Sequence, residues 1–148
     1  MDSSLLLSTD IRAAVPTARF GLTEVKWSIY PFGGSTIKLI QQIGYVHAMD
    51  LLLTARLIDA AQAARLGLIN RLVPPDELMG WAIETAEMIA ANSPSAVQAV
   101  KRQVSATIAD HALTREAMEQ QLGDAVRASP DFAEGIAAFR EKRTPRYE

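Results

Sequence analysis

The chain reads Ala18-Arg19-Phe20-Gly21-Leu22-Thr23-Glu24-Val25-Lys26 near its N-terminus. Before this run, residues 10–17 show an alternating, extended pattern that Pro16 interrupts. After it, residues 31–34 form a predicted loop, and a helix is predicted over residues 35–44, with a glycine at its end. Glu24 therefore stands between a predicted strand and a glycine-rich loop.

Most of the remaining chain is predicted to be helical. Asp59 is placed to cap a short helix through Arg65, and Gly67 suits the left-handed stop after it. One more short strand is expected at residues 68–73. Longer helices are expected at residues 78–92, from residue 93 onward, at about 113–128 and at about 130–142. The helix from residue 93 has a predicted buried face of four apolar residues: Val97, Val100, Val104 and Ile108.

The strands are too few for an independent sheet. Two or three short strands are marginal in water without further partners. The strand region is nevertheless rich in apolar residues. This combination is typical of a fragment whose sheet partners lie in other chain segments or in another subunit.

Composition narrows the class of protein. The 148 residues are 49% hydrophobic and 22% charged, which is near the globular average and excludes wholesale disorder. A net charge of −2 gives no bulk attraction for nucleic acid or an anionic membrane. The chain has no cysteine, so disulfides and thiolate metal sites are excluded. Its N-terminus has no basic flank and no long apolar run, so secretion is not indicated. The predicted location is cytoplasmic, with an organelle protein whose targeting segment is absent from this sequence as the alternative.

Three stretches carry a family resemblance. They are residues 9–36 with Glu24 at their centre, residues 51–70, and residues 132–143, which read Phe-Ala-Glu-Gly-Ile-Ala-Ala-Phe-Arg-Glu-Lys-Arg. In this order and spacing they resemble the C-terminal half of the crotonase (enoyl-CoA hydratase/isomerase) superfamily. The similarity extends over residues 5–146.

The resemblance implies an α/β fold. It consists of the last ββα turns of a crotonase-type spiral, followed by a mostly helical trimerisation region. Residues 1–75 would form the C-terminal part of the ββα core, and residues 76–148 the helical region. The resemblance also implies an acyl-CoA thioester as substrate, a homo-oligomer (a trimer or a dimer of trimers), no metal, and no cofactor beyond the coenzyme A of the substrate.

The resemblance also assigns site residues. Glu24 occupies the position of one of the two carboxylates that move protons when water adds to an enoyl thioester. A substrate pocket is implied at Pro31, Phe32 and Gly33, where Phe32 replaces a common glycine and is expected to reshape the acyl pocket. Contacts to the adenine and phosphate of coenzyme A are implied for Phe139 and Lys142.

Other positions depart from the family pattern. The second glutamate of the family corresponds to Ser4, whose hydroxyl is no base near neutral pH. The oxyanion glycine of the family corresponds to Met1, and Ser28 replaces another common glycine. We therefore expect enoyl-CoA hydratase chemistry that is weak or absent in the isolated chain.

Three alternatives stay open. Within the family, an isomerase or a decarboxylase also fits a single glutamate at this position. Outside catalysis, the chain fits an inactive paralogue or fragment that acts as an oligomerising helical module. The native chain can also extend upstream of Met1 and supply a Gly-Gly-x-Glu segment there.

Overall fold

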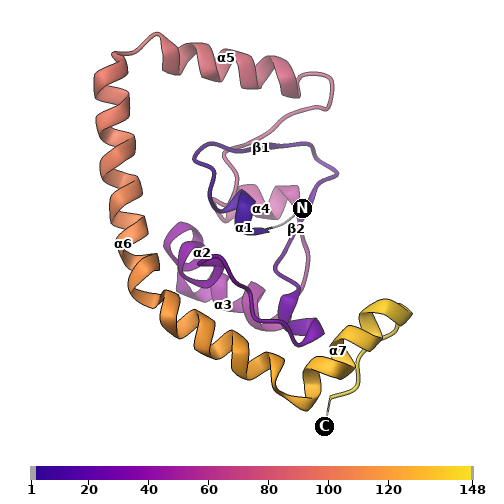
Figure 1. Ribbon diagram of the computed structural model, residues 1–148. Helices are drawn as coiled ribbons and strands as arrows, with labels where there is room; N and C mark the ends of the chain where they lie inside the picture. The colour runs from indigo at the N-terminus through magenta and orange to yellow at the C-terminus, as the bar shows by residue number, and fades with distance from the viewer. Residues whose placement is uncertain (1–2, 148) are drawn as a thin grey trace.

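The fold in the computed structural model is mostly helical, with little β structure (Figure 1). The structure describes the backbone of residues 3–147, and the side chains of that range except those of residues 3–4 and 111–114. The α-helices of this range are α1 (Ser3–Leu6), α2 (Ser35–Ile43), α3 (Tyr45–Thr54), α4 (Ala60–Arg65), α5 (Leu78–Ala90), α6 (Pro94–Arg127) and α7 (Pro130–Glu141). The other elements are a 3-10 helix, η1 (Glu24–Trp27), and the strands β1 (Ala13–Ala14), β2 (Arg19–Phe20), β3 (Ile58–Asp59) and β4 (Arg71–Leu72). The predicted α/β class is confirmed, with helix dominating.

The strands form two separate pairs. Strands β1 and β4 are parallel, with Ala13 opposite Arg71. Strands β2 and β3 are antiparallel, with Arg19 opposite Asp59. The expected strands near residues 10–20 and 68–73 are present, but each contributes only two residues to a ladder. The sequence does not predict β3, because Ile58-Asp59 leads straight into the start of α4.

A single apolar core lies between α2, α3, α4 and the short strands. Leu39, Leu51 and Ile58 are at most 1% exposed, and burying such a side chain contributes roughly 1.5–3 kcal/mol. Among the described side chains, the buried apolar residues fall within residues 7–73, with Ala138 of α7 as the one later addition. The division of the chain at residue 75 stays a prediction.

Arg12 is a charged residue that lies at this apolar core, in the body formed by residues 7–73. It is 9% exposed, and its guanidinium donates to Gln42 Oε1 and to the Leu68 carbonyl, each at 2.9 Å, and to the Thr9 carbonyl at 2.7 Å. Desolvation by burial lowers the pKa of Arg12, and nearby Asp10 opposes that shift. The hydrogen bonds of Arg12 join the segment before β1 to α2 and to the residues before β4. Arg12 therefore stabilises the packing of the N-terminal segment on the core.

Local helix signals are confirmed where the sequence places them. Asp59 Oδ1 accepts a hydrogen bond from the Gln62 N–H at 2.7 Å, which caps α4. Gly44 and Gly67 have φ angles of 80° and 78°, so both occupy positions that favour glycine. These signals act over three or four residues, and for that reason the sequence alone is sufficient to find them.

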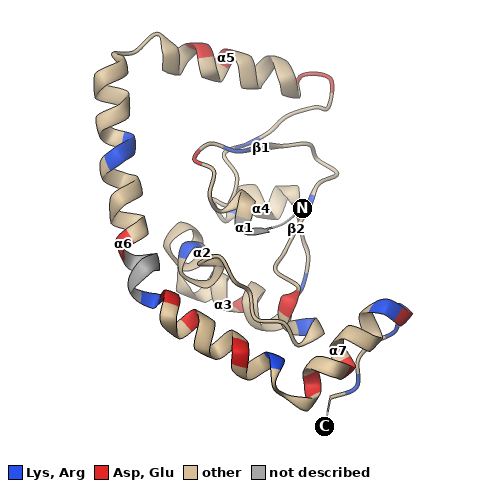
Figure 2. Ribbon diagram, in the orientation of Figure 1, with Lys and Arg blue, Asp and Glu red and all other residues tan. Residues whose placement is uncertain are grey.

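Helices α5 and α6 form an arm that curves around the body (Figure 1). No residue of α5 is buried. The predicted buried face of α6 is wrong, because Val100 is 65% exposed and Val104 is 53% exposed. Lys or Arg and Asp or Glu residues are interspersed along α6 and α7 (Figure 2).

The arm also differs from prediction in its continuity. Residues 94–127 form one helix of 34 residues, where a separate helix was expected to begin near residue 113. No proline or glycine occurs between Pro94 and Gly123, so nothing in the sequence stops the helix. The final helix, α7, lies where the sequence predicts it.

Candidate active site

Glu24 is the first residue of η1, four residues after the end of β2 and three after Gly21. The turn is closed by the Ile29 N–H, which donates to the Glu24 carbonyl at 3.0 Å. It ends at Ser28, whose φ of 52° and ψ of 44° lie in the left-handed region. This geometry favours glycine and explains why a serine there is a departure from the usual residue.

The carboxylate of Glu24 has an unusual environment. Its Oε2 atom is buried and has no hydrogen-bond partner, and it is the one such side-chain atom in the described part of the chain. Leaving a buried acceptor unpaired typically costs about 1–3 kcal/mol. Such an atom needs an explanation, and a functional carboxylate that meets a ligand or water is one.

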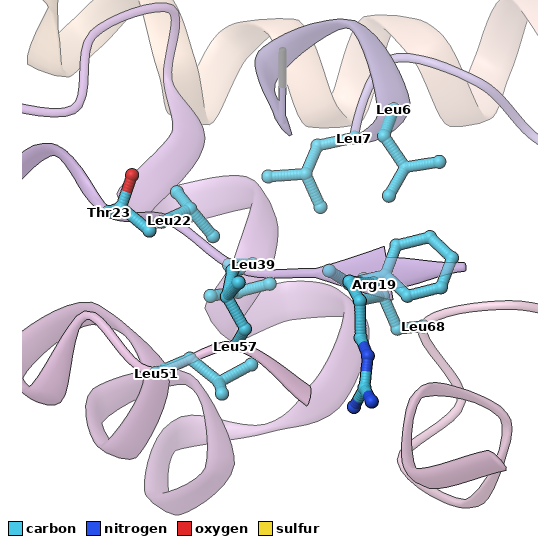
Figure 3. A pocket seen from close by; sticks show the side chains of 11 residues that line it. Leu6, Leu7, Arg19, Leu22, Thr23, Leu39, Leu51, Leu57 and Leu68 are labelled. Atoms are coloured by element: carbon cyan, nitrogen blue, oxygen red, sulfur yellow. The ribbon is translucent and has the colours of Figure 1, made fainter. Parts of the chain in front are cut away.

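A small, mainly apolar cavity lies beside the segment that precedes Glu24, although Glu24 itself does not line it. It has a volume of about 180 Å³, and its lining includes Thr23, which directly precedes Glu24. Figure 3 shows leucine side chains converging on it from α1, α2, α3 and the segments around β2 and β3. The main members are Leu6, Leu7, Leu22, Leu39, Leu51, Leu57 and Leu68. A cavity with this lining accepts apolar groups.

The loop of residues 31–34 lies against α6. The Phe32 ring packs on the α6 backbone, where a Cβ added to Gly123 would come within 1.9 Å of the ring. The guanidinium carbon of Arg127 lies 4.8 Å from the centre of the same ring. Phe32 therefore anchors the arm, and its expected effect on an acyl pocket stays a prediction.

The backbone N–H groups of this loop are bonded to α6 as well. Glu119 Oε1 accepts from the Gly33 N–H at 2.6 Å, and its Oε2 accepts from the Gly34 N–H at 3.1 Å. Gly34 is the N-cap of α2, so Glu119 satisfies free donors at a helix start, where negative charge is favoured. Pro31, the remaining residue of the predicted pocket, is buried.

The predicted coenzyme A contacts lie at α7. Phe139 is 61% exposed, and its ring is edge-on to Trp27 with 5.2 Å between centroids. Lys142 follows α7 with a φ of 55° and is exposed. The structure thus brings Phe139 to the turn that begins with Glu24. Met1 and the Ser4 side chain lie outside the described residues.

Sequence reasoning missed several residues of this region, namely Glu119, Gly123, Gly135 and Tyr147. Each contacts a segment far away in the chain, as in the pairing of Glu119 with Gly33, which are 86 residues apart. No local spacing reports such a contact. Among the side chains that the structure describes within residues 3–147, which leave out residues 3–4 and 111–114, no cluster of three or more histidine, aspartate or glutamate residues is arranged to hold a metal ion. Within that same range, no helix combines the length and apolar character needed to cross a bilayer.

Comparison with known proteins places the chain in a family. Residues 3–148 match the profile described as enoyl-CoA hydratase/isomerase. The chain belongs to this family. A curated member, enoyl-CoA hydratase EchA19 of Mycobacterium tuberculosis, is 44% identical over 99% of the chain and 55% of that protein. The 2,3-dehydroadipyl-CoA hydratase of Escherichia coli is 35% identical over 97% of the chain and 56% of that protein.

Solved structures of the family agree with the fold. The carnitinyl-CoA hydratase from Mycobacterium avium superimposes with a TM-score of 0.91 and 33% identity, covering 99% of this chain and 57% of that one. A methylmalonyl-CoA decarboxylase superimposes with a TM-score of 0.86 and 26% sequence identity. The match covers 98% of this chain and 58% of that one. The chain spans about half the length of the curated relatives that it matches.

Proposed function

We propose that the chain carries part of an enoyl-CoA hydratase site, with Glu24 as one of its two proton-transfer groups. The observation that carries the proposal is the buried, unpaired Oε2 of Glu24. The preceding residue, Thr23, lines a small apolar cavity. The names of its relatives point to the same reaction, because several are hydratases of CoA thioesters. Coenzyme A is part of the substrate, and no further cofactor is needed.

Hydration needs two proton transfers, one from the attacking water and one to C2 of the thioester. As water adds to C3 of the enoyl thioester, one carboxylate takes a proton from the water and an acid delivers a proton to C2. Charge develops on the thioester oxygen meanwhile, and backbone N–H groups must stabilise it. Glu24 is suited to one of the two proton transfers, since its unpaired oxygen is free of competing bonds.

The isolated chain is proposed to be weak or inactive. The position of the second carboxylate is Ser4, and a hydroxyl does not ionise near neutral pH. Loss of one oxyanion donor alone typically lowers kcat by about 10²–10³-fold. We take the chain to represent the C-terminal half of a crotonase domain, with its last ββα turns and helical region.

The substrate contacts also remain proposals. Pro31, Phe32 and Gly33 would form a wall of the acyl pocket. Phe139 and Lys142 would meet the adenine and phosphate of coenzyme A, and the exposed Phe139 ring offers a face for stacking.

Oligomerisation is a second proposed function, and the exposed arm favours it. The chain has 9911 Å² of accessible surface. A compact monomer of its mass, 16.1 kDa, would expose roughly 7,400 Å² by the usual scaling. An excess of roughly 2,500 Å² falls within the size of permanent subunit interfaces. A trimer or a dimer of trimers would cover the apolar residues of α5 and α6.

The reaction class is tested by incubating the chain at high concentration with three thioesters. Crotonyl-CoA reports hydration and methylmalonyl-CoA reports decarboxylation, both followed by mass spectrometry. 3-Butenoyl-CoA reports isomerisation, which leaves the mass unchanged and is followed by the gain of conjugated enoyl-thioester absorbance. The proposal expects slow gain of one water by crotonyl-CoA and no comparable conversion of the other two. Faster isomerisation or loss of carbon dioxide would replace the hydratase assignment.

A further inference from the structure

Helix α7 and the tail after it pack on η1, the turn that begins with Glu24. The ribbon runs from the end of the arm through α7 and back along it to the C-terminus (Figure 1). The Tyr147 hydroxyl and the Lys26 carbonyl meet here although 121 residues separate them in the sequence. The last residues of the chain therefore contact the segment that presents the candidate catalytic carboxylate.

Gly135 makes the closest approach between α7 and η1. A Cβ added to it would stand 2.1 Å from the Trp27 carbonyl oxygen and 2.5 Å from the Trp27 carbonyl carbon. Both atoms are backbone, so no side-chain rotation relieves the overlap, and α7 and η1 must shift relative to each other. Alanine is otherwise the better residue inside a helix. Glycine at this position therefore permits the close contact.

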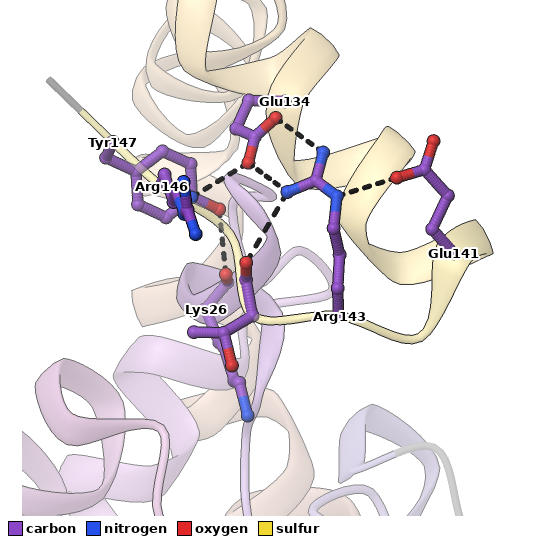
Figure 4. A network of polar contacts seen from close by, with 7 residues as sticks. Lys26, Glu134, Glu141, Arg143, Arg146 and Tyr147 are labelled. Carbon is purple, nitrogen blue, oxygen red and sulfur yellow. Dashed lines mark hydrogen bonds and ion pairs between the residues drawn. The ribbon is translucent and has the colours of Figure 1, made fainter.

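Tyr147 holds the preceding carbonyl group of the same turn. Its hydroxyl donates to the Lys26 carbonyl at 2.7 Å. The tail is held in place by Glu134, whose carboxylate accepts from two Arg143 nitrogens at 2.6 and 2.9 Å and from the Arg146 N–H at 2.8 Å. Figure 4 shows this network directly above Lys26.

We propose that Gly135 and Tyr147 are positioning residues that aim Glu24. They fix two consecutive carbonyl groups of η1, those of Trp27 and Lys26. A 3-10 helix of four residues has few internal hydrogen bonds, so contacts from outside determine its orientation. This inference rests on the proposed function of Glu24 and adds that the C-terminal tail sets the placement of that carboxylate.

The test compares Gly135→Ala and Tyr147→Phe with two matched controls. Gly80→Ala makes the same change in α5, where an added Cβ meets nothing within 4 Å. Tyr45→Phe removes a hydroxyl from a residue that is 65% exposed. The readout is labelling of Glu24 by a carbodiimide and an amine, mapped by mass spectrometry and divided by the labelling of exposed Glu84. This ratio corrects for reagent concentration and reaction time and does not depend on turnover. Global stability is measured separately by urea unfolding, because a larger unfolded fraction would also raise the Glu24 ratio.

The expected result is a rise in the Glu24 ratio of about threefold to tenfold in Gly135→Ala and of about threefold in Tyr147→Phe. Both controls should match the unmodified chain. An unchanged ratio in Tyr147→Phe and Gly135→Ala overturns the inference. If Gly135→Ala does not fold, Tyr147→Phe decides alone, because it removes one oxygen atom from an exposed side chain.

Crotonyl-CoA kinetics separate this inference from the proposed function. The inference expects a lower kcat with an unchanged KM in both positioning variants. Turnover that is lost in Glu24→Gln and normal in both positioning variants overturns the inference and leaves the proposed function in place. Turnover independent of Glu24, together with altered labelling in both variants, supports the positioning contact and overturns the proposed function.

Discussion

Similar apolar residues are buried in the body of the molecule (residues 7–73) and exposed in its α5–α6 arm. In the body, Leu39 and Leu51 are at most 1% exposed. In the arm, Val100 and Met79 are 65% and 71% exposed, although both stand in regular helices. A helical pattern of apolar residues thus indicates which face can be buried. It does not say whether the same chain supplies the surface that covers it.

The arm touches the body through a stripe on α6 with helical spacing. Glu119 bonds to Gly33 and Gly34, Gly123 lies under Phe32, and Arg127 lies over the same ring. These residues are four apart, so they project from one side of the helix. The contact joins the arm to the loop next to the candidate active site, and a few polar and aromatic contacts replace an apolar core there.

The largest expected effect contrasts truncation in the two regions. Leu51→Ala should lower the free energy of unfolding by about 2–5 kcal/mol, because it opens a cavity in the core. Val100→Ala should change it by less than about 0.5 kcal/mol at low protein concentration, because that side chain is exposed. Urea unfolding at several protein concentrations checks both values. A cost for Val100→Ala that grows with concentration would mean that another copy covers the arm.

The next effect concerns the contact between arm and body. Gly123→Ala should cost about 1–3 kcal/mol, because the new methyl group overlaps the Phe32 ring. Gly80→Ala, which meets open space, should instead stabilise the chain by up to about 1 kcal/mol. Adding Phe32→Ala should remove most of the penalty of Gly123→Ala. Strict additivity of the two substitutions would show that the ring and the helix are not in contact.

A pH dependence is expected from the network at the tail. Hydrogen bonds from Arg143 and from the Arg146 N–H lower the pKa of Glu134 from 4.5 to about 2. Its folded pKa is depressed, so its stabilising contribution is complete above pH 4.5 and is lost as pH falls toward 2. The difference in unfolding free energy between the unmodified chain and Glu134→Gln should therefore be similar at pH 5 and pH 7 and less than half as large at pH 3. A difference that grows on acidification would contradict this assignment.

The smallest effect concerns backbone strain beside Glu24. Ser28→Gly should stabilise the chain by about 0.5–1 kcal/mol, because Ser28 has a φ of 52°. Ser105→Gly, in the interior of α6, should destabilise it by a similar amount. Thermal unfolding of both variants measures the contrast. Equal destabilisation by both substitutions would show that Ser28 is unstrained.

Local parts of this structure were predictable from the sequence, and contacts across the chain were not. The cap at Asp59 and the stops at Gly44 and Gly67 depend on neighbouring residues, so they follow from the sequence. Glu24 was identified from its flanking residues, although its unpaired oxygen was not foreseen. The hydrogen bond from Tyr147 to Lys26 joins residues that are 121 apart in the sequence, and no periodicity predicts it. The exposed valines of α6 were misjudged because burial depends on what covers a face.

The central claim is that Glu24 is the proton-transfer carboxylate of a site that this chain holds only in part. Its most direct test is the rate of crotonyl-CoA hydration by the unmodified chain, by Glu24→Gln, and by Glu84→Gln as a matched control on the arm. We expect a very slow rate that Glu24→Gln abolishes and Glu84→Gln leaves unchanged. Hydration that proceeds equally well after Glu24→Gln would contradict the claim.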